Sequence, residues 1–207
     1  MPPVASPLNE WGVRGVNVRL LPVVGVAVLL TGGFAGCSSS DESSAGANPQ
    51  GVVSVEPFDS LDISTGLVVE LQVKTGSTQR VELEAASGSV TTEVSGNTLS
   101  LGQTGDDGKA TVTIPELSSV RVTSGSKLTA TGEAGSYTLT LDSGSEAMAR
   151  DLSAKTVNVD FSSGSTGEIS ASDTVAGELD DGSILTVSGG ADTAAVEVND
   201  GSEISTS

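Results

Sequence analysis

The sequence predicts an all-β fold, a right-handed parallel β-helix-like solenoid with about 19 residues in each coil. Three observations predict it: a glycine corner recurs at near-equal intervals, short alternating strands fill each interval, and turn-forming residues leave no room for a helix. The chain has 207 residues, of which 26 are glycine and only five are aromatic. A narrow coil interior has little space for aromatic rings, so their scarcity agrees with this fold.

The recurring corner is a tripeptide, first Ser-Gly-Ser and later Asp-Gly-Ser. Its glycine stands at positions 125, 144, 164, 182 and 201, so the corners recur at nearly equal spacing. Glycine takes a positive φ without a Cβ penalty, and the neighbouring Ser or Asp can hydrogen-bond the turn backbone. An antiparallel sandwich would also give short strands, but it does not require the same corner once in every cycle. The parallel coil does, because equivalent corners stack in register along one edge.

The intervals between corners contain short runs with period-two alternation, for example Thr138–Leu141 before a corner and Leu128–Ala130 after one. Such alternation places one face of each strand in the interior and the other in solvent. The predicted interior residues are Val120, Val122, Leu128, Ala130, Leu139, Leu141, Val157, Val159, Ile169, Leu179, Leu185, Val187, Val196 and Val198.

Residues 52–120 also alternate, as in Val68–Val73 and Arg80–Glu84, but their repeat is weaker. The separations between their strands resemble hairpin loops, so this part is either antiparallel or a set of irregular early coils. Because the composition does not change near position 120, we expect a single domain over residues 52–207, with the repeat coils in 121–207.

The N-terminal residues have a different composition. Residues 1–36 combine Arg14 and Arg19 with an apolar run that begins at Leu20 and ends in small residues, which is typical of a secretory signal. The apolar run is short and interrupted by glycine for a membrane-spanning helix. The sequence Phe34-Ala35-Gly36-Cys37 resembles a bacterial lipobox, with Phe34 where leucine is usual. The resemblance implies cleavage between Gly36 and Cys37, lipidation of Cys37, and a polar tether over residues 37–51.

Composition excludes several function classes. The absence of histidine rules out a Ser-His-Asp triad and an imidazole metal site, and a single cysteine rules out an internal disulfide. A formal net charge of -18 argues against a nucleic-acid partner. We therefore expect no catalytic, cofactor-binding or metal-binding residues. Calcium in the aspartate-rich turns is the sharpest alternative, although we interpret these residues as turn formers. The candidates would be Asp106, Asp107, Asp180, Asp181, Asp192 and Asp200.

Over residues 55–205 the sequence resembles the family of the putative auto-transporter adhesin head GIN domain. The resemblance rests on Phe58–Ile63 at the start of the domain, Val112–Leu117 at the end of its first half, and the Ser-Gly-Ser repeats after Val120. It implies a bacterial envelope protein without an established activity.

Two functions from different classes follow from these observations. The first is an exported lipoprotein, anchored to the cell or outer membrane through Cys37, whose non-enzymatic domain serves adhesion or envelope interaction with a glycan or protein. The alternative is a carbohydrate-binding or carbohydrate-active β-helix protein. A groove with a carboxylate pair and an exposed aromatic residue would favour the alternative, and the candidate aromatics are Tyr137 and Phe161. We expect Tyr137 to be a packing residue at the edge of a coil.

Overall fold

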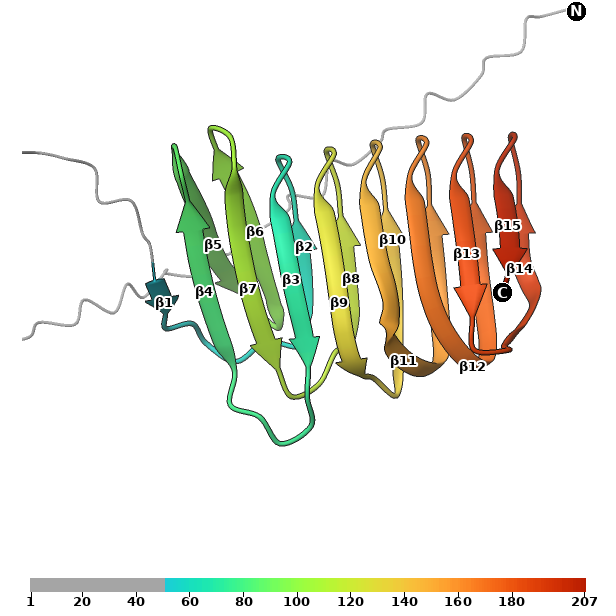
Figure 1. The fold of residues 1–207 in the computed structure, drawn as a ribbon, viewed down its shortest axis with the longest axis horizontal. Helices are drawn as coiled ribbons and strands as arrows, with labels where there is room; N and C mark the ends of the chain where they lie inside the picture. The colour runs from blue at the N-terminus through green and yellow to red at the C-terminus, as the bar shows by residue number, and fades with distance from the viewer. Residues whose placement is uncertain (1–50) are drawn as a thin grey trace, which may run out of the picture. The chain divides into compact units, whose positions relative to one another are not determined.

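The computed structural model describes residues 51–207, which form fifteen β-strands and no helix (Figure 1). The predicted all-β class is therefore confirmed for this part of the chain. It also contains no helical segment that could cross a membrane. The strands are β1 (Gly51–Val53), β2 (Ser60–Ile63), β3 (Val68–Val73), β4 (Arg80–Ala85), β5 (Ser89–Ser95), β6 (Thr98–Thr104), β7 (Gly108–Ile114), β8 (Ser119–Val122), β9 (Lys127–Glu133), β10 (Ser136–Leu141), β11 (Glu146–Phe161), β12 (Thr166–Leu179), β13 (Ile184–Ser188), β14 (Asp192–Val198) and β15 (Glu203–Thr206).

All the strands belong to one sheet that curls back on itself into two facing rows (Figure 1). One row runs β4, β7, β3, β9, β11, β12, β13, β15. The other runs β5, β6, β2, β8, β10, β11, β12, β14. Strands β11 and β12 bend through both rows, their first halves in one and their second halves in the other. Two short runs were expected in each of these intervals. Instead each interval is a single strand, of 16 and 14 residues, with register shifts where it turns.

From β8 to the C-terminal end, neighbouring strands are parallel, and each pairs with the equivalent strand of the next repeat. Leu139 on β10 lies opposite Val159 on β11, and Val159 opposite Gly177 on β12. The register keeps inward positions above inward positions, so apolar side chains from both rows form one continuous core. Twelve of the fourteen predicted interior residues are buried. The prediction is wrong for Val196 and Val198, which face inward but remain partly exposed because no described strand covers them.

The corners form the ladder that the repeat predicts. The Gly125 N–H donates to the carbonyl of Ser143 at 3.1 Å, and equivalent bonds of 2.9–3.1 Å link each later corner to the next. Both central residues have a positive φ, for example 58° at Ser124 and 69° at Gly125, which is the backbone of a type I′ turn. Asp181 takes a φ of 52° in a later corner, so aspartate replaces serine in the same left-handed conformation.

The third residue of the first four corners is a buried serine, and in three of them its hydroxyl donates to a carbonyl of the same turn. Ser165 Oγ donates to the Ser162 carbonyl at 2.6 Å, and Ser183 Oγ donates to the Asp180 carbonyl at 2.8 Å. A buried hydroxyl needs such a partner, because leaving it unpaired in the core costs about 1–3 kcal/mol. The expectation that serine hydrogen-bonds the turn backbone is therefore confirmed.

The sheet is mixed, so an entirely parallel coil is wrong for residues 51–114. Strand β4 is antiparallel to β1 and β7, and β5 is antiparallel to β6, whereas β2, β3, β6 and β7 also form parallel pairs. Both alternatives left open by the sequence are therefore partly correct. The physical reason is an insertion: β2 pairs with β8 and β3 with β9, although the whole segment from β4 to β7 lies between them in the chain. The intervening strands β4–β7 add to the same end of the sheet, and β4 and β5 run in the opposite direction.

Candidate functional site

The lipidation site predicted from the sequence, Cys37 with cleavage after Gly36, lies outside the described residues. The predicted layout of residues 1–36 as signal and 37–51 as tether stays a prediction for the same reason, apart from Gly51, which begins β1. The site residues that the structure describes are the turn aspartates and the aromatic side chains.

The turn aspartates are distributed along the sheet and have backbone roles. Asp181 and Asp200 occupy left-handed corner positions, and their carbonyls accept the N–H groups of Gly164 and Gly182 at 2.9 and 3.1 Å. Asp107 has a φ of 64° in the loop between β6 and β7. Asp192 accepts a hydrogen bond from the Ala194 N–H at 2.9 Å. Among residues 51–207, no group of three or more acidic side chains is placed to hold a metal ion.

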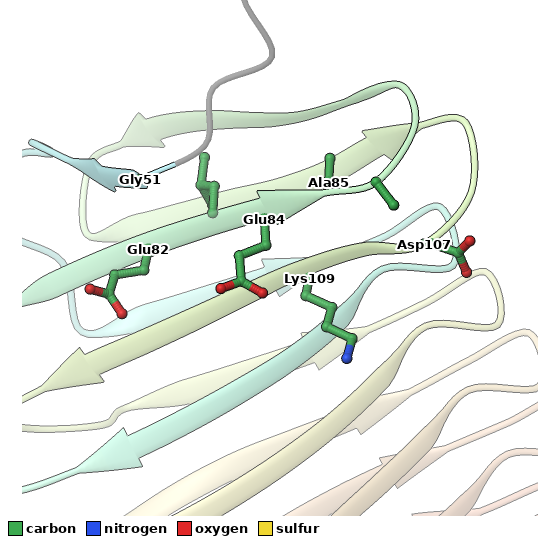
Figure 2. Close-up of a pocket in the computed structure, with 8 residues that line it drawn as sticks. Gly51, Glu82, Glu84, Ala85, Asp107 and Lys109 are labelled. Carbon is green, nitrogen blue, oxygen red and sulfur yellow. The ribbon is translucent and has the colours of Figure 1, made fainter.

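One hollow lies beside β1, at the end of the row that begins with β4 (Figure 2). Its volume is about 840 Å³, and Glu82, Glu84, Asp107 and Lys109 provide its charged groups. Glu84 and Lys109 lie opposite each other in the antiparallel register of β4 and β7. Glu82 forms an ion pair with Arg80. This hollow is open and carries mixed charges, with no buried polar side chain at its floor.

A second hollow of about 530 Å³ crosses the other row, over β5, β6, β2 and β8. Its charged groups are Asp62, Glu93, Arg121 and Asp142, and most of its other lining residues carry hydroxyls. Arg121 lies opposite Asp62 in the parallel register, but it takes part in no ion pair within the described residues. An added Cβ at Gly102 would lie 3.3 Å from Thr65 Oγ1 and from Thr91 Oγ1. The absence of a side chain at Gly102 therefore deepens this hollow, which we call the trough.

Asp142, at the rim of the trough, is held in its ionised form. Hydrogen bonds from Ser163 and Ser162 lower its pKa below the usual aspartate range, and the Ser162 hydroxyl lies 3.1 Å from Asp142 Oδ1. The trough thus combines three carboxylates, one guanidinium and several hydroxyls. Such a surface can hydrogen-bond polar partners, but nothing in it supplies a shifted acid–base pair.

No sequence pattern indicated this trough, because its polar residues are ordinary Asp, Glu, Arg, Ser and Thr from four strands and three corners. They come together only through the pairing of β2 with β6 and β8. Arg121 could be found from the sequence only as an isolated cation, and its position beside Asp62 depends on a pairing between distant segments of the chain.

All three aromatic side chains of residues 51–207 are buried: Phe58, Tyr137 and Phe161 are 5%, 3% and 1% exposed. The expected packing role of Tyr137 is therefore confirmed. Its hydroxyl has no hydrogen-bond partner, and burial raises its pKa far above the usual tyrosine value. None of these rings can serve as a stacking platform for a sugar. The exposed aromatic residue that would have favoured the carbohydrate alternative is therefore not found among the described residues.

Glu178 marks a different electrostatic environment near the C-terminal end. Asp180 and Glu197 raise its pKa above the usual glutamate range by repulsion between like charges. Glu197 lies directly opposite Glu178 in the register of β12 and β14, and Asp160 lies opposite it on the other side. Asn199 donates to Glu178 Oε1 at 3.1 Å and partly offsets this repulsion. Carboxylates therefore stack on successive strands in this part of the sheet.

Comparison with known proteins gives one family and several structures of low similarity. A crystal structure of a putative adhesin from Bacteroides fragilis is 13% identical, with a TM-score of 0.42, and covers 75% of this chain and 94% of its own. A putative adhesin from Parabacteroides merdae is 10% identical, with a TM-score of 0.36 and coverages of 75% and 94%. A putative lipid binding protein from Parabacteroides distasonis is 9% identical, with a TM-score of 0.33 and coverages of 78% and 98%.

None of the curated proteins matches this sequence. Residues 57–207 match the family model for the head GIN domain, which spans nearly all of the described strands. The chain therefore belongs to the family described as "Putative auto-transporter adhesin, head GIN domain".

Proposed function

We propose that this protein is an exported lipoprotein whose β-domain acts without catalysis, in adhesion or in interactions within the cell envelope. The observation that carries the proposal is the family match over residues 57–207, because the family is described as an adhesin head. The lipobox-like sequence that ends at Cys37 supports export and anchoring. The domain would then lie outside the cytoplasm, on the cell membrane or the outer membrane.

The proposed layout has three parts. Residues 1–36 are removed as a signal peptide, Cys37 becomes the lipidated N-terminus, and residues 37–51 form a polar tether. A diacylglyceryl group together with an N-acyl chain supplies more than one buried chain, which is enough for stable anchoring. Residues 52–207 form a single domain, and we interpret its parallel part as a short β-solenoid. The stacked corners and the pairing of each strand with its equivalent in the next repeat support this interpretation.

A non-enzymatic role agrees with the surface of the domain. Outward positions along the strands carry mainly Ser, Thr, Asp and Glu, and the two hollows described above are open and polar. A rigid sheet that displays such groups can present many weak hydrogen-bonding contacts to a partner. Glycans and envelope proteins are the partners that this proposal implies.

Anchoring is tested by expressing the full chain and its Cys37→Ser variant in a bacterial host, with a labelled palmitate precursor. We expect label and membrane association for the native chain, and neither for the variant. Mass spectrometry of the purified native chain should place its N-terminus at Cys37. An unlabelled native chain, or a labelled variant, would show that the anchoring proposal is wrong.

Adhesion is tested by displaying the protein on the host and measuring attachment to arrays of glycans and envelope components, with and without calcium. We expect attachment above that of cells with the empty vector, and no hydrolysis of any glycan on the array. Display without attachment to any component would contradict adhesion, and release of sugar products would contradict the non-enzymatic role.

A further inference from the structure

The last two strands leave an unpaired edge at one end of the sheet. Within residues 51–207, β14 pairs only with β12, and β15 pairs only with β13. One long side of each strand therefore has no described neighbour, and the two sides lie together at the same end of the domain (Figure 1). Unpaired strand edges are templates for the addition of another strand.

The backbone geometry identifies the free groups. The Asn199 N–H donates to the Leu179 carbonyl at 2.8 Å, and the Glu203 N–H donates to the Ser183 carbonyl at 2.9 Å. Because successive N–H groups of a strand point to opposite sides, those of Val198 and Ile204 point away from the sheet. An added strand would therefore find donors and acceptors in a regular row on β14 and on β15.

The core is also uncovered at this end. Val198 lies opposite the buried Leu179, and Ile204 lies opposite the buried Leu185, so both side chains occupy core-facing positions. Val198 is nevertheless 40% exposed, and Ile204 is only partly buried. A further strand with apolar residues at alternate positions would cover them, as each earlier strand covers the one before it.

The charge of this end of the sheet indicates which kind of strand can add to it. Residues 156–207 contain ten acidic and no basic side chains. Four of these acids, Asp192, Glu197, Asp200 and Glu203, lie in β14, β15 and the corner between them. A second copy of this end would bring like charges together, whereas a basic segment would be attracted and oriented.

We propose that this edge, formed by β14 and β15, accepts an extended basic segment of a partner protein by β-strand addition. Because β14 and β15 lie in different rows, one extended stretch pairs with one of the two strands. Such a stretch alternates apolar residues, which cover Val198 on β14 or Ile204 on β15, with Lys or Arg residues, which face the carboxylates. The recognition mode is main-chain pairing with side-chain specificity at alternate positions. The inference goes beyond the proposed function and does not depend on it, because neither lipidation nor adhesion is needed for the edge to pair.

The test uses the full chain and a short synthetic peptide of alternating valine and lysine. A second peptide has the same sequence with N-methyl groups on alternate amides, which keeps its charge and blocks strand pairing. We expect the first peptide to bind and the methylated one to bind at least about tenfold more weakly, since several backbone hydrogen bonds are lost. Hydrogen exchange should show new protection of the Val198 amide, of the Ile204 amide, or of both.

Matched variants separate the edge from the general acidity of the protein. Glu197→Gln with Glu203→Gln removes two charges at the edge, and Glu70→Gln with Glu116→Gln removes two charges elsewhere. We expect the edge variant to weaken binding about threefold to tenfold at low salt and the control to weaken it less. Equal binding of both peptides, equal losses in both variants, protection of other strands, or self-association of the chain through this edge at neutral pH would each overturn the proposal.

Discussion

The two ends of the sheet are built differently although each ends in a pair of strands. At one end, β4 runs antiparallel to β7, and β1 covers part of its outer side through the pairs Gly51–Leu83 and Val53–Val81. Val81 and Leu83 are almost completely buried there. At the other end, Val198 and Ile204 occupy equivalent core-facing positions and remain partly exposed. A reversed strand with a short covering segment therefore closes the core in the row that begins with β4, whereas a further parallel strand leaves it open at the other end.

The two ends also differ in charge. All seven basic residues after position 50 lie between Lys74 and Lys155, and residues 156–207 have none. The ion pairs Arg80–Glu82 and Lys127–Glu146 lie in the first part, although exposed pairs of this kind contribute little to stability. Arg150 reaches into the acidic part and pairs with Glu168 at 3.3 Å, whereas Glu178 takes part in no ion pair within the described residues. Repulsion by neighbouring carboxylates raises the pKa of Glu178.

A valine-to-alanine substitution should reveal the largest difference between the two ends, in the free energy of unfolding that is lost. Val81→Ala removes two buried methyl groups and leaves a cavity, so it should lower the free energy of unfolding by about 2–3 kcal/mol. Val198→Ala, in the corresponding inward position at the open end, should lower it by less than about 1 kcal/mol because its side chain is already exposed. Urea unfolding of both variants checks this. Equal losses would mean that the two ends are equally well covered.

The two ends should also differ in how readily their strands open locally. We expect the amides of β14 and β15 to exchange with solvent at least about tenfold faster than those of β4, because few apolar contacts hold the terminal strands. Native-state hydrogen exchange measured strand by strand gives this ratio. Slow exchange throughout β14 and β15 would contradict the interpretation of this end as open.

Glu178→Gln should stabilise the protein at neutral pH. The native pKa of Glu178 is raised, so its ionised form carries a penalty that is fully present above that pKa. The stability of the native chain should fall as the pH rises from the usual glutamate pKa through the raised value. The variant should lack this fall and melt at a higher temperature at pH 7. Thermal unfolding of the two chains at several pH values checks this. Melting temperatures that change with pH in the same way in both chains would contradict the repulsion.

Asp142→Asn should have a smaller effect of the opposite sign. Hydrogen bonds from Ser162 and Ser163 lower the native pKa of Asp142, so its contribution to stability is complete above the usual aspartate pKa. This contribution is lost as the pH falls through the lowered native value. The variant should therefore melt at a lower temperature than the native chain at pH 7, and the difference should disappear in acid. A difference that persists in acid would assign the effect to packing.

The sequence predicts the structure best where the backbone requires special residues. The corners at Ser124-Gly125 and Asp181-Gly182 need two successive left-handed residues, and few residue types accept this conformation. The sequence predicts it least well where the pairing of strands depends on segments that are distant in the chain. The corner Thr65-Gly66 has the same backbone, yet its Gly66 N–H donates to Ser126 Oγ, far along the chain, and no periodicity reveals such a contact.

The candidate site was less predictable than the fold. The trough around Arg121 is made of residue types that occur throughout the chain, and its shape depends on the absence of a side chain at Gly102. Val196 and Val198 alternate like any core residues, so their sequence alone could not show that they would remain uncovered. In both cases the sequence does not show which strands lie next to each other, because strand pairing is a property of the whole sheet.

The insertion between β3 and β8 has a consequence for how the chain folds. Contacts among β10, β11 and β12 join segments that are one repeat apart, whereas the pairing of β2 with β8 closes a loop about three times as long. The longer loop costs about 1 kcal/mol more in chain entropy before any contact forms. We therefore expect β10, β11 and β12 to assemble before β2 pairs with β8, so that β2 joins a template that already exists.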